Sequence, residues 1–112
     1  MSRTREQLIA RALNKLGAVG AGQSPEAEDS ALIDDALDSI VADLTARGIY
    51  SWADPDEIED AAYEHLAQIV AVACARDFGK EPDEGVRQVS EARLRQINPV
   101  TLSGRPQPAE FI

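Results

Sequence analysis

The two residues best suited to nucleophilic or acid–base chemistry are a single histidine, His65, and a single cysteine, Cys74. His65 falls on a predicted helix beside its apolar stripe, and no serine or cysteine nucleophile is patterned around it. We therefore expect a packing or surface role for His65. Cys74 lies in an apolar run, which is typical of an inert, buried thiol. The sequence predicts no catalytic site, and hence a protein that is not an enzyme.

Metal and cofactor chemistry has equally little support. Asp34, Asp35 and Asp38 cluster three carboxylates, but these side chains fall on the predicted exposed face of a regular helix and have no His or Cys beside them. The glycines within residues 17–22 follow a predicted helix rather than a strand, and no lysine stands where a phosphate loop requires one. We expect neither a metal nor a cofactor.

Charge is unevenly distributed along the 112 residues, whose net charge is −9. Residues 24–60 hold twelve acidic groups against Arg47 alone, whereas residues 1–23 hold four basic groups against Glu6 alone. An acidic chain is a poor free-standing nucleic-acid binder, because such proteins carry basic surfaces. Two interpretations remain open: a solvated acidic face, or a basic helix that meets an acidic helix within the chain or across a subunit boundary.

No segment indicates secretion or membrane insertion. The N-terminal segment alternates charged and apolar residues, so it lacks the apolar run of a signal peptide. No stretch approaches the roughly 20 apolar residues of a membrane span. A single cysteine cannot form an internal disulfide. We expect a soluble protein made in a cytoplasm.

The first two helices are predicted from their caps. Thr4 and Gln7 form a capping box that starts the first, and Gly17 ends it. Ser24 and Pro25 are an N-cap and a first helical residue for the second, which runs to Gly48. The apolar stripe of the second helix comprises Ile33, Leu37, Ile40 and Leu44.

The third helix is predicted to be the central one. It should begin at Asp54-Pro55 and run to Phe78, before Gly79. Apolar residues cover more than half of its circumference, so it should be buried from several sides. The main stripe comprises Leu66, Ile69, Val70 and Ala73, and a back of small residues comprises Ala67, Ala71 and Ala75. Another helix, from this or a neighbouring subunit, could approach that back closely.

A fourth helix, with Val86, Val89, Leu94 and Ile97, should end before Pro99. The fold class is therefore all-α, a small bundle of about four helices over residues 1–98, with an extended C-terminal arm over residues 99–112. Three prolines and a glycine keep the arm from forming a regular helix.

Tyr50 and Trp52 stand in the short loop between the second and third helices. Trp52 could plug the end of the bundle, or it could anchor an interface, where Trp and Tyr are enriched.

Several of these segments together resemble one family. The opening QLIARALNKLGAVGAG, with Ala12, Leu13, Lys15, Leu16 and Gly17, is similar to the first helix of phage head-to-tail connector proteins, including the adaptors that stabilise packaged DNA. The run Asp34, Ala36, Leu37, Ile40, Leu44 before a glycine also resembles the family. So do the aromatic loop and the alanine-rich helix that closes on Asp77-Phe78-Gly79. The resemblance covers about residues 5–97.

The resemblance implies a virion structural protein at the head–tail junction, assembled in the host cytoplasm. Identical subunits, commonly about twelve, would form a ring beneath the portal protein, extend the DNA channel, and offer a platform to a stopper or tail protein. DNA would pass through without sequence-specific binding, and no membrane is involved. The arm that docks to the portal would comprise Val100, Leu102, Arg105, Phe111 and Ile112. Candidate subunit contacts are Arg11, Lys15, Tyr50, Trp52, Ala67, Ala71 and Ala75. Candidate channel-facing acids are Glu28, Asp34, Asp35 and Asp38.

A second hypothesis of a different class is a small acidic cytoplasmic module, for example an inhibitor that imitates nucleic acid. Its binding face would be the acidic second helix, and the tail would be dispensable. Deletion of residues 99–112 therefore separates the two hypotheses, because only the adaptor needs them to bind its partner.

Overall fold

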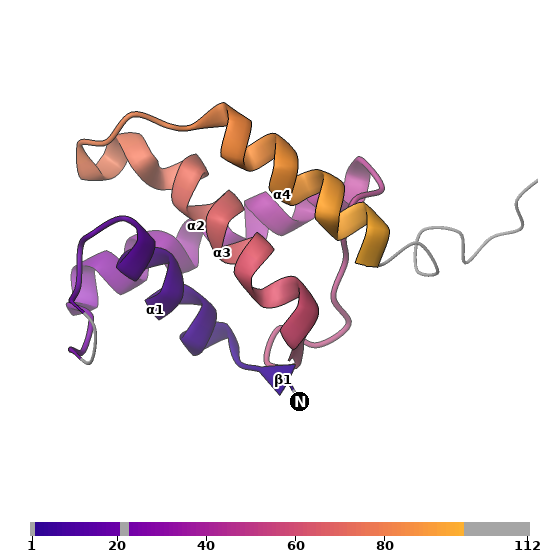
Figure 1. Cartoon of the computed structure of the whole chain (residues 1–112). Coiled ribbons are helices and arrows are strands. Elements are labelled where there is room, and N and C mark those ends of the chain that lie inside the picture. Colours follow the sequence, from indigo (N-terminus) through magenta and orange to yellow (C-terminus); the bar gives the residue numbers. More distant parts are fainter. Residues whose placement is uncertain (1, 21–22, 98–112) are drawn as a thin grey trace, which may run out of the picture.

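The computed structural model describes residues 2–20 and 23–97, and this part of the chain is a bundle of four α-helices (Figure 1). The all-α class and the four helices predicted from the sequence are confirmed. The elements are β1 (Ser2–Arg3), α1 (Arg5–Lys15), α2 (Ala27–Ala46), β2 (Ile58–Glu59), α3 (Asp60–Cys74), the 3-10 helix η1 (Ala75–Phe78) and α4 (Glu84–Ile97). None of the described helices is long and apolar enough to cross a membrane.

Helix α3 occupies the centre of the bundle, and α1, α2 and α4 all pack against it (Figure 1). Leu66, Ala67 and Val70 on α3 have no exposed surface, and the core around them is built from leucine and isoleucine of α1 and α2. The predicted central position of this helix is therefore confirmed. Because α3 is apolar on several sides, it can serve as the common partner of three helices.

The capping box and the helix-ending glycines that the sequence predicts are confirmed. The Thr4 hydroxyl accepts a hydrogen bond from the Gln7 N–H at 3.1 Å, and the Gln7 side chain accepts one from the Thr4 N–H at 2.9 Å. Gly17, Gly48 and Gly79 each have φ near +70°, the left-handed conformation that ends a helix.

The predicted starts of the second and third helices are wrong. Helix α2 begins at Ala27, so Ser24 and Pro25 precede it rather than cap it. Asp54 forms a local turn instead of a cap, because its Oδ1 accepts the Asp56 N–H at 2.9 Å. The chain then continues as β2, which pairs antiparallel with β1 and delays α3 to Asp60.

Two predicted core positions are also wrong. Val89 on α4 is 59% exposed, and Ala73 on α3 is exposed. Helix α4 instead buries Leu94 together with the polar residues Ser90 and Glu91. Residues three apart, such as Val86 and Val89, do not point in the same direction from a helix. The stripe predicted for α4 therefore could not keep every member against α3.

Candidate interaction surfaces

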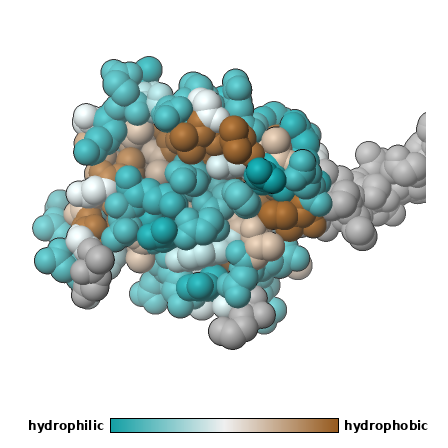
Figure 2. Space-filling view, viewed as in Figure 1, coloured by the Kyte–Doolittle hydropathy of each residue, from teal (hydrophilic) through white to brown (hydrophobic). Residues whose placement is uncertain are grey.

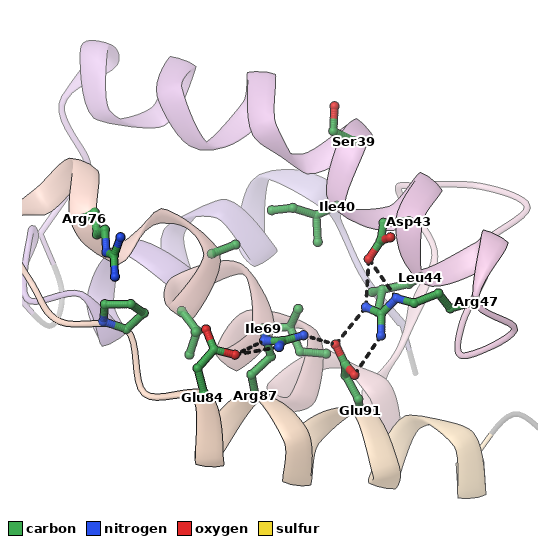
Figure 3. Close-up of a pocket in the computed structure, with 13 residues that line it drawn as sticks. Ser39, Ile40, Asp43, Leu44, Arg47, Ile69, Arg76, Glu84, Arg87 and Glu91 are labelled. Atoms are coloured by element: carbon green, nitrogen blue, oxygen red, sulfur yellow. Dashed lines mark hydrogen bonds and ion pairs between the residues drawn. The ribbon is translucent and has the colours of Figure 1, made fainter.

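A groove lies between α2 and α4, with α3 as its floor. Its volume is about 550 Å³. Ile40, Ile69 and Val72 give it an apolar base, and charged side chains of α2 and α4 form its rim (Figure 3). We call it the interhelical groove.

A network of four ion pairs crosses one end of the interhelical groove. Arg47 at the end of α2 donates to both oxygens of Glu91 on α4, at 3.0 and 2.9 Å, and to Asp43 at 2.7 Å (Figure 3). Arg87 donates to Glu91 at 2.8 Å and also pairs with Glu84. The Glu91 side chain is only 9% exposed, so its charge is stabilised by two arginines rather than by water. The network ties α4 to α2.

The hydrogen bonds from Arg47 hold the pKa of Glu91 below its ordinary value of 4.5, against the opposing effect of burial. A carboxyl group whose folded pKa is lowered adds stability above its unfolded pKa, and this stability is lost as the pH falls through the folded value. The Glu91→Gln variant should therefore lose about 1–2 kcal/mol of unfolding free energy at pH 7, since the arginines are about one-third exposed and partly screened.

Urea unfolding of wild type and Glu91→Gln from pH 7 to pH 2.5 measures this contribution. The difference between them should shrink below pH 4.5 as the wild-type carboxylate becomes protonated. Glu84→Gln, at a side chain that is 57% exposed, is the matched control and should change stability much less. A difference that stayed constant down to pH 2.5 would contradict the role of the Glu91 charge.

The predicted acidic face is partly neutralised inside the chain. Arg5 of α1 donates to Asp34 at 2.7 Å and pairs with Asp38 at 3.0 Å. Its guanidinium also lies 6.0 Å from the centre of the Trp52 ring. A basic helix thus meets the acidic helix within one chain. Glu28 and Asp35 are exposed and have no ion-pair partner among the described residues.

The Arg5→Ala variant should lose about 1–2 kcal/mol of unfolding free energy, because it removes two partly exposed ion pairs and the packing of the side chain on Trp52. Arg76→Ala is the control, since Arg76 is exposed and forms no ion pair with any described residue. Thermal unfolding followed by circular dichroism compares the two. Equal melting temperatures for both variants would show that Arg5 does not join α1, α2 and the loop.

The predicted subunit contacts are mostly used within the chain. Ala67, Ala71 and Ala75 are buried by the chain's own helices, at 0, 7 and 3% exposure, so they are removed from the set of expected subunit contacts. The reason is that the core already fills the space over the small residues. Arg11 and Lys15 both pair with Glu64 of α3, each at 2.8 Å.

The aromatic loop packs on the bundle. Tyr50 is buried, and burial raises its pKa to about 12. Trp52 is half-buried against the core and meets Tyr50 edge-on, with ring centres 6.5 Å apart. The bundle thus covers Tyr50 and leaves part of Trp52 at the surface.

The residues considered first for chemistry lie apart. Cys74 is buried, which raises the pKa of its thiol. His65 is half-buried beside Val86 and Val89 of α4. Within residues 2–20 and 23–97 no group of three His, Cys, Asp or Glu side chains is arranged to hold a metal ion. The predicted arm, with Val100, Leu102, Arg105, Phe111 and Ile112, lies outside the described residues.

The described part of the chain is thus a small all-α protein with charged surfaces and a groove between helices. Comparison of the chain with protein-family models, with curated proteins and with solved structures found no match. The sequence did not predict the buried ion pairs of Glu91 or the contacts by which Arg5 joins α1 to α2. The only local signal was the four-residue spacing of Arg87 and Glu91, which is typical of a helical ion pair.

Proposed function

We propose that the chain is a head-to-tail adaptor of a tailed phage or phage-like particle. In this role, identical copies form a ring beneath the portal, extend the DNA channel and carry the next stopper or tail protein. The chain is a structural protein here, without a reaction of its own.

One observation carries the proposal: the glycines of the resembling segments are the ones that end helices. Gly17 closes the opening segment, Gly48 follows the α2 run, and Gly79 follows Asp77-Phe78. Among the described residues these three are the only ones with positive φ. The resembling segments thus coincide with the helix boundaries of the bundle, which is what a shared fold requires.

The surface of α2 supports the channel role. Glu28 and Asp35 stay exposed and unpaired among the described residues, whereas Asp34 and Asp38 share Arg5. A ring that turned the acidic side of α2 toward its lumen would repel DNA phosphates, so the duplex would slide without adhering. Arg5 reduces this repulsion at the other two carboxylates.

The segment after α4 supplies the portal contact in this proposal. Val100, Leu102, Phe111 and Ile112 are apolar residues among prolines, and prolines reduce the entropy lost when a segment becomes ordered. Arg105 adds one positive charge.

The test is a pull-down of the portal ring from the same phage or prophage with the full chain and with a chain that lacks residues 99–112. The adaptor predicts that only the full chain binds. Circular dichroism should show the same number of helical residues in both chains. Equal binding of a partner by both chains would instead favour an acidic module that binds through α2.

A further inference from the structure

Most of the outer face of α4 is exposed, and its Gly85 and Val89 line a hollow together with His65 and Gln68 of α3. Val89 is the one large hydrophobic side chain that is strongly exposed there, at 59%. Gly85, Ala92 and Gln96 lie beside it on the side of α4 opposite the buried Leu94. Figure 2 shows hydrophobic surface over the first turns of α4. We call these four residues, with Arg93 and Arg95, the α4 face.

The α4 face is positively charged. Arg93 and Arg95 flank Val89 and Ala92 on the two sides of the helix, and neither arginine forms an ion pair with a described residue. Helix α4 has two acids: Glu84 in its first turn pairs with Arg87, and Glu91 is buried and points toward α2 (Figure 3). The chain as a whole has a net charge of −9, so this face stands out from the rest of the surface.

The outer side of α2 is negatively charged, and like the α4 face it includes two small residues. Glu28, Asp35, Ala42 and Ala46 are exposed and lie opposite the buried Leu37. We call these four residues the α2 face. Small side chains let another helix approach closely, and the two carboxylates match the arginines of the α4 face in charge and in number.

The two faces point away from each other. Ser39, on the same side of α2 as Asp35, points away from α4 in Figure 3. On α4, Val89 lies about 160° around the helix from Glu91, the residue that reaches toward α2. A contact between the α4 face of one copy and the α2 face of another therefore joins different surfaces. Such head-to-tail contacts generate rings or filaments.

We propose that the α4 face of one copy binds the α2 face of a second copy, and that this contact builds the oligomer. The inference rests on the proposed adaptor function, because it names the contact from which the ring would be made. Arg93 and Arg95 meet Glu28 and Asp35, and Val89 packs between the alanines of the neighbouring α2. Because the contact takes up Glu28 and Asp35, these two carboxylates would not line the lumen. Their neighbours Asp34 and Asp38, whose side chains are 50 and 78% exposed, would be the acids of α2 that face DNA.

Two charge reversals test the contact: Arg93→Glu on the α4 face and Asp35→Arg on the α2 face. Each variant alone should self-associate roughly ten- to a hundredfold more weakly than wild type, because like charges then meet at every contact. An equal mixture should recover the oligomer, since the carboxylate introduced on the α4 face of one variant meets the guanidinium introduced on the α2 face of the other, and the remaining contacts are wild type. Native mass spectrometry should show the two variants alternating.

Controls separate this contact from general charge effects and from the proposed function. Lys80→Glu and Glu57→Arg make the same charge changes at exposed loop residues and should leave the mass distribution unchanged. Circular dichroism verifies that each variant is folded. A wild-type oligomer that neither reversal affects would overturn this contact and leave the adaptor proposal standing. A wild-type chain that remains monomeric also overturns it, as does an Arg93→Glu variant that keeps its mass distribution and loses only binding to a portal ring. Portal binding by wild type that does not need residues 99–112 would instead count against the adaptor.

Discussion

The Leu66→Asp variant should have no cooperative unfolding transition and should be largely unfolded at 25 °C. Leu66 is fully buried at the centre of α3, the helix against which the other three pack. The substitution places a carboxylate among the apolar side chains of the core, and it also removes a leucine from that core. The two effects together should cost more than about 4 kcal/mol, a large share of the 5–15 kcal/mol that stabilises a small domain.

Thermal and urea unfolding followed by circular dichroism measures the effect. Ala73→Asp is the matched control, because it introduces the same charge on the same helix at an exposed residue. That variant should melt within a few degrees of wild type, as exposed substitutions usually change stability by less than about 0.5 kcal/mol. A cooperative melt of Leu66→Asp at the wild-type temperature would show that α3 is not the centre of the core.

The double variant Phe111→Ala, Ile112→Ala should bind a portal ring about a hundredfold or more weakly, with its helical fold intact. Each side chain, once buried in a partner cleft, contributes on the order of 1.5–3 kcal/mol. Both residues lie outside the described residues, in the arm that the proposal assigns to the portal, so we expect the helices to keep their wild-type stability.

Surface plasmon resonance on immobilised portal rings, with circular dichroism of the same samples, tests this expectation. Pro106→Ala with Pro108→Ala is the control, because it changes the same segment and removes no large apolar anchor. It should weaken binding less. Unchanged affinity of the Phe111, Ile112 double variant would exclude these two residues as anchors.

Features encoded by neighbouring residues were predictable from the sequence. The Thr4–Gln7 capping box and the helix-ending Gly17, Gly48 and Gly79 depend on contacts within a few residues. The burial of Leu37, Leu44 and Leu66 follows from helical periodicity, which is also local. The four helices and the central position of α3 therefore emerged correctly.

Features that depend on distant residues were not predictable in detail. Ile58 pairs with Arg3 across 55 positions, and this pairing keeps the chain extended where Asp54-Pro55 had predicted a helix. Glu91 is 44 positions from Arg47, so nothing near it in the sequence indicates that it is buried. The meeting of a basic and an acidic helix was one of two interpretations that the sequence left open, and only the fold shows that Arg5 joins them within one chain.

The most direct test of the adaptor is the mass of the purified protein, measured by native mass spectrometry alone and with a portal ring, for the full chain and for a chain lacking residues 99–112. An adaptor should form a closed oligomer of many copies, or its copies should assemble on the portal ring and need residues 99–112 to do so. A monomer or dimer whose mass is unaffected by the portal ring, with or without those residues, would contradict it.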